Sequence, residues 1–161
     1  GEVMGLDTDF KRAFAKSQLA SGARLPESGT VFISVKDRDK ENVVDLARRL
    51  RDLGFGLMAP GGTAAHLKAA GLEVREVKKV LEGRPHCVDA ILNSEVQLII
   101  NTTEGTQAVS DSFSIRRSAL TQGVPYYTTM AGAAAALAAL EALQTGTLEV
   151  APLQSYFSGS F

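Results

Sequence analysis

The sequence predicts a three-layer α/β/α domain built around a five-stranded parallel sheet. Five short apolar runs rich in β-branched residues alternate along the chain with segments whose apolar residues recur at helical spacing. The runs are continuous rather than alternating in polarity, which is typical of parallel strands buried on both faces. Strands joined through helices lie side by side in one sheet, so we expect helices on both of its faces.

The chain begins with a short helix and a linker. Residues 10–19 show helical apolar spacing, Asp9 precedes them as a capping residue, and Gly22 and Pro26 end the helix. Residues 22–29 are rich in turn-forming residues. We therefore expect two parts, residues 1–25 and residues 26–161, of which the second is the α/β domain.

The elements of the second part follow in a regular order. Strands are predicted at residues 31–35, 55–58, 72–77, 96–100 and 126–128. Asp37 or Asp39 caps the helix after the first strand, and Gly54 ends it. Later helices are predicted at residues 63–70, 87–94, 107–120 and 131–143, with a polar loop at residues 78–86. In the helix at residues 87–94, the side chains of Val88, Ile91 and Leu92 are expected to point inward.

Composition narrows the possible functions. The 161 residues have room for one domain with a modest appendage, and 45% apolar with 22% charged residues is an ordinary globular mixture. The 17 basic and 18 acidic residues nearly cancel, which argues against nucleic acid or an anionic membrane as a partner. The alanine-rich helix is too short to cross a bilayer, and the N-terminus has no signal-peptide pattern.

The cysteine and histidine content indicates the setting of the protein. Cys87 is the only cysteine, which excludes an intrachain disulfide, and no Cys/His cluster has zinc-site spacing. A reducing, cytoplasmic location is therefore expected, and no metal site is predicted. The chain starts at Gly1 rather than Met, which we interpret as a piece of a longer protein.

One strand end resembles an anion-binding turn. In parallel sheets ligands bind outside the carboxyl ends of the strands. There, residues 59–63 read Ala-Pro-Gly-Gly-Thr and lead into a helix, whose first N–H groups are free to bind an anion. The helix dipole favours an anion by roughly 0.3–1 kcal/mol at exposed sites. The alternative interpretation is a plain strand-to-helix turn.

Other polar residues follow neighbouring strands. Lys40 and Lys79 can each supply a cation for a phosphate, although either could equally be a solvated surface lysine. Asn101, Thr102 and Thr103 follow the fourth strand and can read a ribose or base edge, although they could also form a simple turn.

The remaining polar residues do not form a catalytic set. Arg84 can pair with a ligand, with Glu82 or with Asp89, and His86 is interpreted as a loop histidine. Of Arg116 and Arg117, we expect one to be solvated and the other to form an ion pair. No nucleophile with a matched base is present, and no pair of carboxylates follows the strands. A pocket rich in donors and poor in acids suits binding an anion, so no catalytic residue is predicted.

Several motifs, in the same order and spacing, resemble the carboxyl-terminal allosteric domain of bacterial carbamoyl-phosphate synthase large chains. These motifs are residues 1–5 (Gly-Glu-Val-Met-Gly), 79–80 (Lys-Val), 82–86 (Glu-Gly-Arg-Pro-His), 99–103 (Ile-Ile-Asn-Thr-Thr) and 115–120 (Ile-Arg-Arg-Ser-Ala-Leu). The resemblance covers nearly the whole chain. It implies that residues 1–25 are the end of the second synthetase half with a linker helix.

The resemblance implies a methylglyoxal-synthase-like fold, with Rossmann-like topology and strand order 3-2-1-4-5. It also implies a site for nucleoside monophosphates, with UMP as inhibitor and IMP as activator. The phosphate positions would be Lys40, Gly62, Thr63 and Lys79. The nucleoside positions would be Ser34, Asn101, Thr102 and Thr103.

For the longer protein, the resemblance implies a glutamine-hydrolysing, ATP-dependent ligase that uses Mg or Mn and serves pyrimidine and arginine biosynthesis. Its partners would be the rest of the large chain, a small glutaminase (amidotransferase) subunit and, in some relatives, further copies of itself. Ornithine would bind where this domain meets the synthetase half. This part of the chain would itself need no cofactor besides the effector nucleotide.

This sequence departs from the family pattern at one position. Pro60 stands where many relatives have a phosphate-binding threonine, so one donor is lost. Two alternatives remain. A methylglyoxal-synthase-like lyase acting on dihydroxyacetone phosphate would need aspartates where this chain has Pro85 and Thr103. An oligomerisation module would need no ligand.

Overall fold

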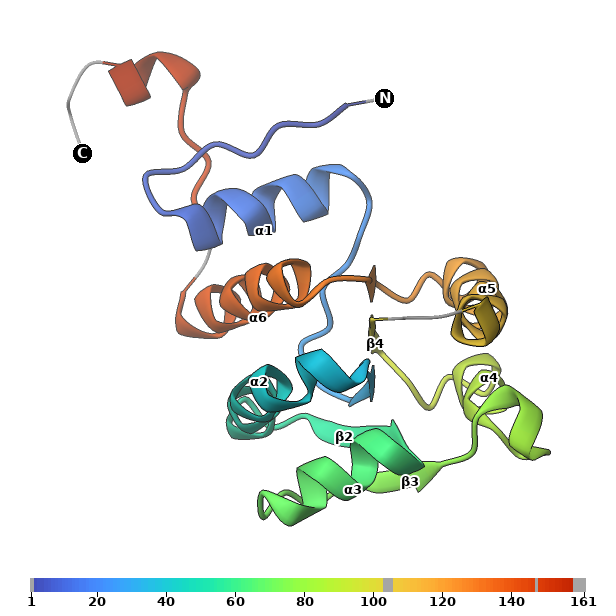
Figure 1. Ribbon diagram of the computed structural model, residues 1–161. Coiled ribbons are helices and arrows are strands. Elements are labelled where there is room, and N and C mark those ends of the chain that lie inside the picture. The colour runs from blue at the N-terminus through green and yellow to red at the C-terminus, as the bar shows by residue number, and fades with distance from the viewer. Residues whose placement is uncertain (1, 103–105, 147, 158–161) are drawn as a thin grey trace.

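The computed structural model describes residues 2–102, 106–146 and 148–157, and for residues 106–110 the backbone alone. Within these residues, five strands form one sheet in the order β3-β2-β1-β4-β5 (Figure 1). All four neighbouring pairs are parallel, which confirms the predicted fold class and strand order. The strands are β1 (Thr30–Ser34), β2 (Gly56–Pro60), β3 (Arg75–Val77), β4 (Leu98–Asn101) and β5 (Tyr126–Tyr127).

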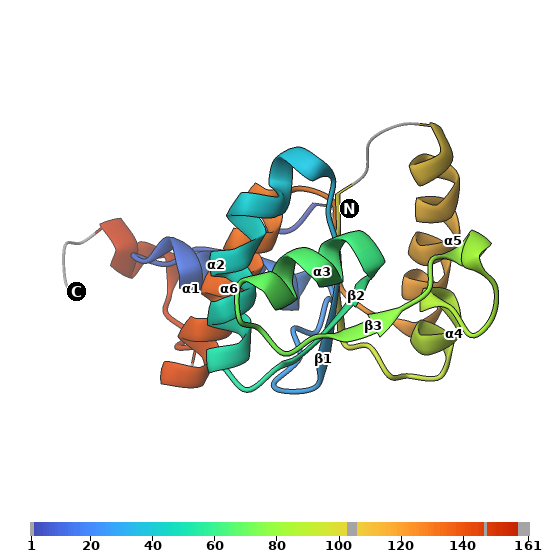
Figure 2. The same cartoon turned by 60° about the horizontal axis from the view of Figure 1, so that its bottom comes forward.

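The helices cover both faces of this sheet, as predicted. They are α1 (Phe10–Ala20), α2 (Lys40–Asp52), α3 (Gly61–Ala69), α4 (Cys87–Leu92), α5 (Thr106–Gln122) and α6 (Met130–Thr145). Three 3-10 turns add η1 (Asp37–Asp39), η2 (Val80–Glu82) and η3 (Leu153–Phe157). Figure 2 shows α1, α2 and α6 on one side of the strands and α4 and α5 on the other.

Strand β1 divides the core into two clusters. Its side chains alternate between the faces of the sheet, so Val31 and Ile33 pack with helices α2 and α6. Phe32 points to the opposite face, where it packs with Ile91 of α4 and Ile115 of α5. All three β1 side chains are buried. This two-sided burial explains the continuous apolar run in the sequence.

Two local predictions are wrong. Leu92 is 45% exposed, because the inward face of the short helix α4 is formed by Cys87, Ala90 and Ile91, at i, i+3 and i+4. The side chains of Asp37 and Asp39 do not cap α2. Instead η1 precedes the helix, and the carboxylate of Asp37 pairs with the ammonium of Lys40.

Helix α1 packs against α6 beside the sheet (Figure 1). The predicted Asp9 cap is confirmed, because its side chain accepts a hydrogen bond from the backbone N–H of Lys11 at 2.7 Å. Ala15 is completely buried, and the hydroxyl of Tyr127 donates to Gln18 at 3.0 Å. The boundary between residues 1–25 and 26–161 stays a prediction. Of the helices described, none is long and apolar enough to cross a membrane.

Glu141 links three helices. The guanidinium of Arg49 on α2 donates two hydrogen bonds of 2.8 Å to its carboxylate on α6. The ammonium of Lys11 on α1 lies 3.9 Å from the same carboxylate. Hydrogen bonding from Arg49 lowers the pKa of Glu141 below the ordinary glutamate value of 4.5. The ionised carboxylate therefore stabilises the packing of α1, α2 and α6.

We expect Glu141→Gln to lower the free energy of unfolding by about 0.5–1 kcal/mol at pH 7, since bidentate geometry places this pair at the upper end for ion pairs near the surface. Because the folded-state pKa is lowered, the contribution is present above pH 4.5 and is lost as the pH falls through the folded-state pKa. Urea unfolding at pH 7 and pH 3 measures it. The control is Asp45→Asn, in an exposed pair with Arg48. The assignment would be contradicted if the difference in unfolding free energy from wild type were no smaller at pH 3 than at pH 7. An equal loss in the control would contradict it as well.

Candidate anion-binding site

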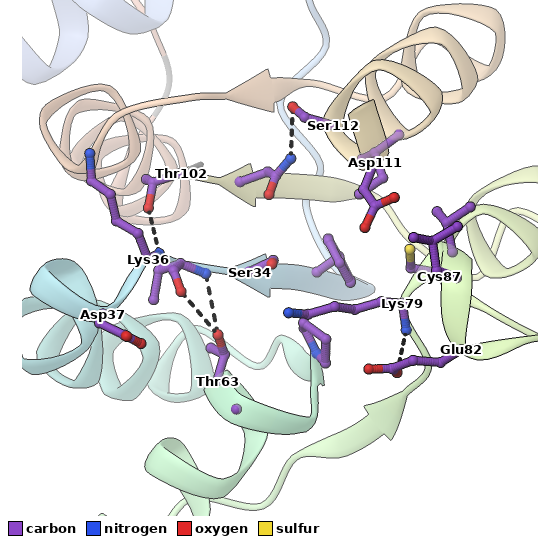
Figure 3. A pocket seen from close by; sticks show the side chains of 18 of the residues that line it. Ser34, Lys36, Asp37, Thr63, Lys79, Glu82, Cys87, Thr102, Asp111 and Ser112 are labelled. Atoms are coloured by element: carbon purple, nitrogen blue, oxygen red, sulfur yellow. Dashed lines mark hydrogen bonds between the residues drawn. The ribbon is translucent and has the colours of Figure 1, made fainter. Parts of the chain in front are cut away.

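A cavity of about 680 Å³ opens at the carboxyl ends of β1, β2 and β4 (Figure 3). Seven of the predicted site residues line it: Ser34, Lys40, Gly62, Thr63, Lys79, Asn101 and Thr102. The eighth, Thr103, lies outside the described residues. The structure thus brings into one pocket the predicted residues that it describes. Their role in binding stays a prediction.

Lys40 lies against the first turn of α3. It is the first residue of α2, and its side chain is 26% exposed. A Cβ built on Gly62 would lie 3.6 Å from its ammonium nitrogen, so the glycine leaves room beside the cation. The Lys40 Nζ lies 2.6 Å from Oδ1 of Asp37. This ammonium is therefore paired with a carboxylate of the pocket.

Lys79 follows β3, and its side chain also lines the pocket. Its side chain extends into the pocket toward Thr63 and Ser34 (Figure 3). Its backbone N–H donates to Oε2 of Glu82 at 2.8 Å, which fixes the start of η2. Lys40 lowers the pKa of Asp37, and the field of Lys79 adds to this effect. Lys40 and Lys79 both line this pocket, so they lie on the same side of the molecule.

Two threonines hold the chain where it leaves β1. The backbone N–H of Val35 donates to Oγ1 of Thr63 at 3.2 Å, and that of Lys36 donates to Oγ1 of Thr102 at 3.1 Å. Both threonines are buried. A hydroxyl that accepts one bond still carries a hydrogen to donate. The hydroxyl of Thr63 also donates to the carbonyl oxygen of Val35 at 3.5 Å, so its hydrogen is engaged. Thr63 and Thr102 are therefore structural residues first, and of the two it is Thr102 that retains a donor for a ligand.

Asn101 is oriented by a small polar network at the end of β4. Its Nδ2 donates to the hydroxyl of Tyr126 at 2.7 Å and to Oγ of Ser112 at 3.2 Å, and those two hydroxyls lie 3.0 Å apart. Because Nδ2 is engaged, the carbonyl oxygen of this amide is the group left to accept a bond from a ligand. The sequence analysis missed Ser112 and Tyr126, which come from α5 and β5.

The pocket contains more acid than the sequence predicts. The carboxylates of Asp37, Glu82 and Asp111 line it beside three lysines, Lys36, Lys40 and Lys79. The prediction of a pocket poor in acids is wrong, because it rested on the acids of residues 59–63 and 101–105, whereas Asp37 follows β1, Glu82 follows β3 and Asp111 comes from α5. Asp111 points inward from α5 (Figure 3). Its spacing with Ser112 and Ile115, which also line the pocket, is the helical signal that could have identified it.

The loop at residues 78–86 is held to α4 by Asp89. The guanidinium of Arg84 lies 2.7 Å from its carboxylate, so one of the predicted partners is correct. The backbone N–H of His86 donates to Asp89 at 2.9 Å, and the ring packs beside the same group.

Arg116 and Arg117 are both exposed, and Arg116 lies over the ring of Tyr126 at 5.5 Å. Neither arginine forms an ion pair with the described residues, so the expected pairing stays a prediction.

Metal-binding clusters are not found in the described part of the chain, where no group of three or more His, Cys, Asp or Glu side chains gathers. The apolar wall of the pocket is formed by Phe32, Val80, Leu81, Cys87 and Ile115. The pocket therefore offers both charged groups and apolar surface, which suits an amphipathic anion such as a nucleotide.

Comparisons with known proteins agree with the fold described above. The family of MGS-like domains matches residues 42–128. The chain is 61% identical over 157 residues to the carbamoyl phosphate synthase large chain of Rhizobium meliloti (strain 1021), covering 98% of this chain and 14% of the relative. The corresponding protein of Myxococcus xanthus (strain DK1622) is 58% identical, with 97% and 14% covered. The chain thus spans about one seventh of these relatives.

A shorter relative locates the match within the large chain. It is named as the C-terminal section of the carbamoyl phosphate synthase large chain of Aquifex aeolicus (strain VF5), and it is 48% identical, with 89% of this chain and 27% of the relative covered. Among solved structures, methylglyoxal synthase from Elizabethkingia anophelis NUHP1 has a TM-score of 0.57 and 17% identity, covering 85% of this chain and 95% of that one. At that identity, the likeness shows the fold alone.

Cys87 provides a test of the pocket wall. The side chain is 2% exposed, and burial raises the pKa of its thiol to about 11. Because the thiolate is the reactive form, we expect iodoacetamide at pH 8 to alkylate the folded chain roughly 100-fold more slowly than the urea-unfolded chain. Mass spectrometry measures this directly, since there is one cysteine. Equal rates in the two states would show that the wall is open.

Proposed function

We propose that this chain, which belongs to the family of MGS-like domains, is the nucleotide-binding regulatory domain of a carbamoyl phosphate synthase large chain. The observation that carries the proposal is the convergence of Lys40, Lys79 and the first turn of α3 on one pocket. Each group favours a phosphoryl anion, and together they surround one space at the end of the sheet.

The phosphate would bind at the start of α3. The backbone N–H groups of Gly61, Gly62 and Thr63 belong to the first turn, where no earlier carbonyl is available to them. Pro60 lines the pocket immediately before them and supplies neither a hydroxyl nor an N–H. The proposal therefore assigns the missing threonine contact to these backbone donors and to the two lysines.

The nucleoside would lie toward α5. The carbonyl oxygen of Asn101 and the hydroxyls of Ser34 and Thr102 offer hydrogen bonds to ribose or base. Phe32, Val80 and Ile115 offer apolar surface to the base. A volume of about 680 Å³ lies within the range of small-ligand pockets. We propose UMP as inhibitor and IMP as activator, each of which must bind two states of the longer protein unequally.

The rest of the proposal concerns the longer protein. Its relatives are named carbamoyl phosphate synthase large chains, and we propose that activity for the protein to which this chain belongs. The proposal includes ATP with Mg or Mn, a small glutaminase subunit, and an ornithine site at the junction with the synthetase half. It also includes a cytoplasmic location and a role in pyrimidine and arginine biosynthesis.

We expect Lys79→Ala to weaken UMP binding by roughly 1.5–3 kcal/mol, because the change removes a charge-assisted contact to phosphate. Calorimetric titration with UMP and with IMP measures the dissociation constants. The matched control is Lys78→Ala, since Lys78 is an exposed neighbour that does not line the pocket. An unchanged dissociation constant for Lys79→Ala would remove Lys79 from the site. The absence of saturable heat with either nucleotide at millimolar concentration would overturn the nucleotide proposal.

A second candidate is a lyase acting on dihydroxyacetone phosphate, favoured by the methylglyoxal synthase fold and by the carboxylate of Asp111 in the pocket. We expect no turnover, because general acid–base catalysis requires carboxylates where this chain has Pro85 and Thr103. The measurement is methylglyoxal formation by wild type and by Asp111→Asn. A wild-type rate that Asp111→Asn abolishes would replace the regulatory proposal.

A further inference from the structure

The lysine best placed for the phosphate is paired with a carboxylate of the same pocket. The ammonium of Lys40 lies 2.6 Å from Oδ1 of Asp37, three residues earlier in the chain. Within the described residues, Asp37 is the only ion-pair partner of Lys40. The side chain of Asp37 is 95% exposed, whereas that of Lys40 is 26% exposed. A solvent-exposed carboxylate is thus paired with a partly buried ammonium.

The position of this carboxylate matters because it lines the same pocket. Asp37 belongs to η1, which joins the end of β1 to the start of α2. Its pKa is lowered by Lys40 first and by the field of Lys79, so it is ionised at neutral pH. The neighbouring Asp39 is directed elsewhere, with its carboxylate 4.0 Å from the ammonium of Lys36. Of the two η1 acids, Asp37 is therefore the one paired with Lys40, and it also lines the pocket with Lys79.

We propose that Asp37 is an internal competitor for the effector phosphate: its carboxylate is paired with Lys40 and must leave that lysine when a nucleoside monophosphate binds. This inference rests on the proposed function and adds a residue that sets the affinity of the site. Lys40 exchanges one anionic partner for another, so the net charge change at this end of the pocket is smaller than the charge of the ligand.

The exchange is physically easy. Exposed ion pairs hold their partners weakly, and Asp37 can swing into water without a desolvation cost. A phosphate carries up to two negative charges and three acceptor oxygens, so it outcompetes a single carboxylate for Lys40 and the helix amides. An uncharged nucleoside has no group that replaces the carboxylate. Asp37 therefore weakens the binding of phosphorylated ligands and leaves the binding of an uncharged nucleoside unchanged.

The exchange also offers a route by which occupancy could be sensed. Asp37 and Lys40 flank the first turn of α2, and α2 packs against α6, which carries α1. Release of Asp37 changes the contacts of η1 at the start of this helix layer. The competitor is thus placed between the pocket and the helices that pack beside the N-terminal segment.

The test is calorimetric titration of wild type and Asp37→Asn with UMP, with inorganic phosphate and with uridine. Asp37→Asn removes both the competing partner and a repulsive charge, so we expect UMP to bind roughly threefold to thirtyfold more tightly. Binding of uridine should not strengthen. The matched control is Asp39→Asn, which removes the same charge from the same turn without touching Lys40. We expect it to change UMP affinity less than about twofold.

A double variant separates direct competition from general repulsion. If Asp37 acts by occupying Lys40, the gain from Asp37→Asn should disappear in a Lys40→Ala background. An equal gain with and without Lys40 would overturn the proposal. Thermal melting of each variant checks that the fold is retained, which the exposure of Asp37 favours.

The outcomes distinguish this inference from the proposed function. Wild type that binds UMP while Asp37→Asn binds it no more tightly would overturn the competitor and leave nucleotide binding intact. Wild type that binds neither UMP nor phosphate, with Asp37→Asn binding both, would support the competitor as a strong one. Failure of both proteins to bind either ligand would overturn both proposals.

Discussion

The end of strand β1 is the point on which the candidate site depends. The backbone N–H groups of Val35 and Lys36 have passed beyond the sheet pairing, and buried N–H groups without partners are costly. Thr63 and Thr102 accept hydrogen bonds from them, so the start of α3 and the end of β4 are tied to the same two residues. This tie lies at β1, where the strand order changes direction and parallel sheets place their ligands. The pocket thus forms where the backbone N–H groups after β1 find their hydrogen-bond acceptors.

Charge balance is the second feature of the pocket. Three lysines and three carboxylates line it, and an anion that reaches Lys40 meets an ammonium already paired with Asp37. Binding is then an exchange of partners, whose free energy is a difference between two ion pairs and is smaller than either alone. A regulatory site benefits from such moderation, because an effector must bind and leave as its concentration changes. The polar network around Asn101 needs no exchange, since its Nδ2 is already engaged.

The likeness to methylglyoxal synthase illustrates that a shared fold does not define chemistry. The same sheet edge can carry proton-transfer groups or a set of anion donors, according to the side chains that the loops and helices supply. Here two lysines and the first turn of α3 line the pocket, and Asp111 enters it from α5 rather than from a strand end. The high identity to the large chains extends over 98% of this chain, and the match to MGS-like domains, at residues 42–128, includes Thr63, Lys79 and Asn101 but not Lys40.

The sequence by itself determined the parallel α/β architecture, most helix and strand positions, and the residues that follow each strand. Hydrophobic periodicity and glycine helix ends are local signals, and Gly54 and Gly71 indeed adopt positive φ after α2 and α3. The strand order came from family resemblance and was confirmed. Only the tertiary structure decided that Asp37 pairs with Lys40 instead of capping α2, that Asp111 reaches the pocket, and that Leu92 is exposed. The Asp37–Lys40 pair joins residues three apart, and it forms because η1 precedes α2. The other two outcomes depend on how distant elements pack, because the partners of a side chain come together only after folding.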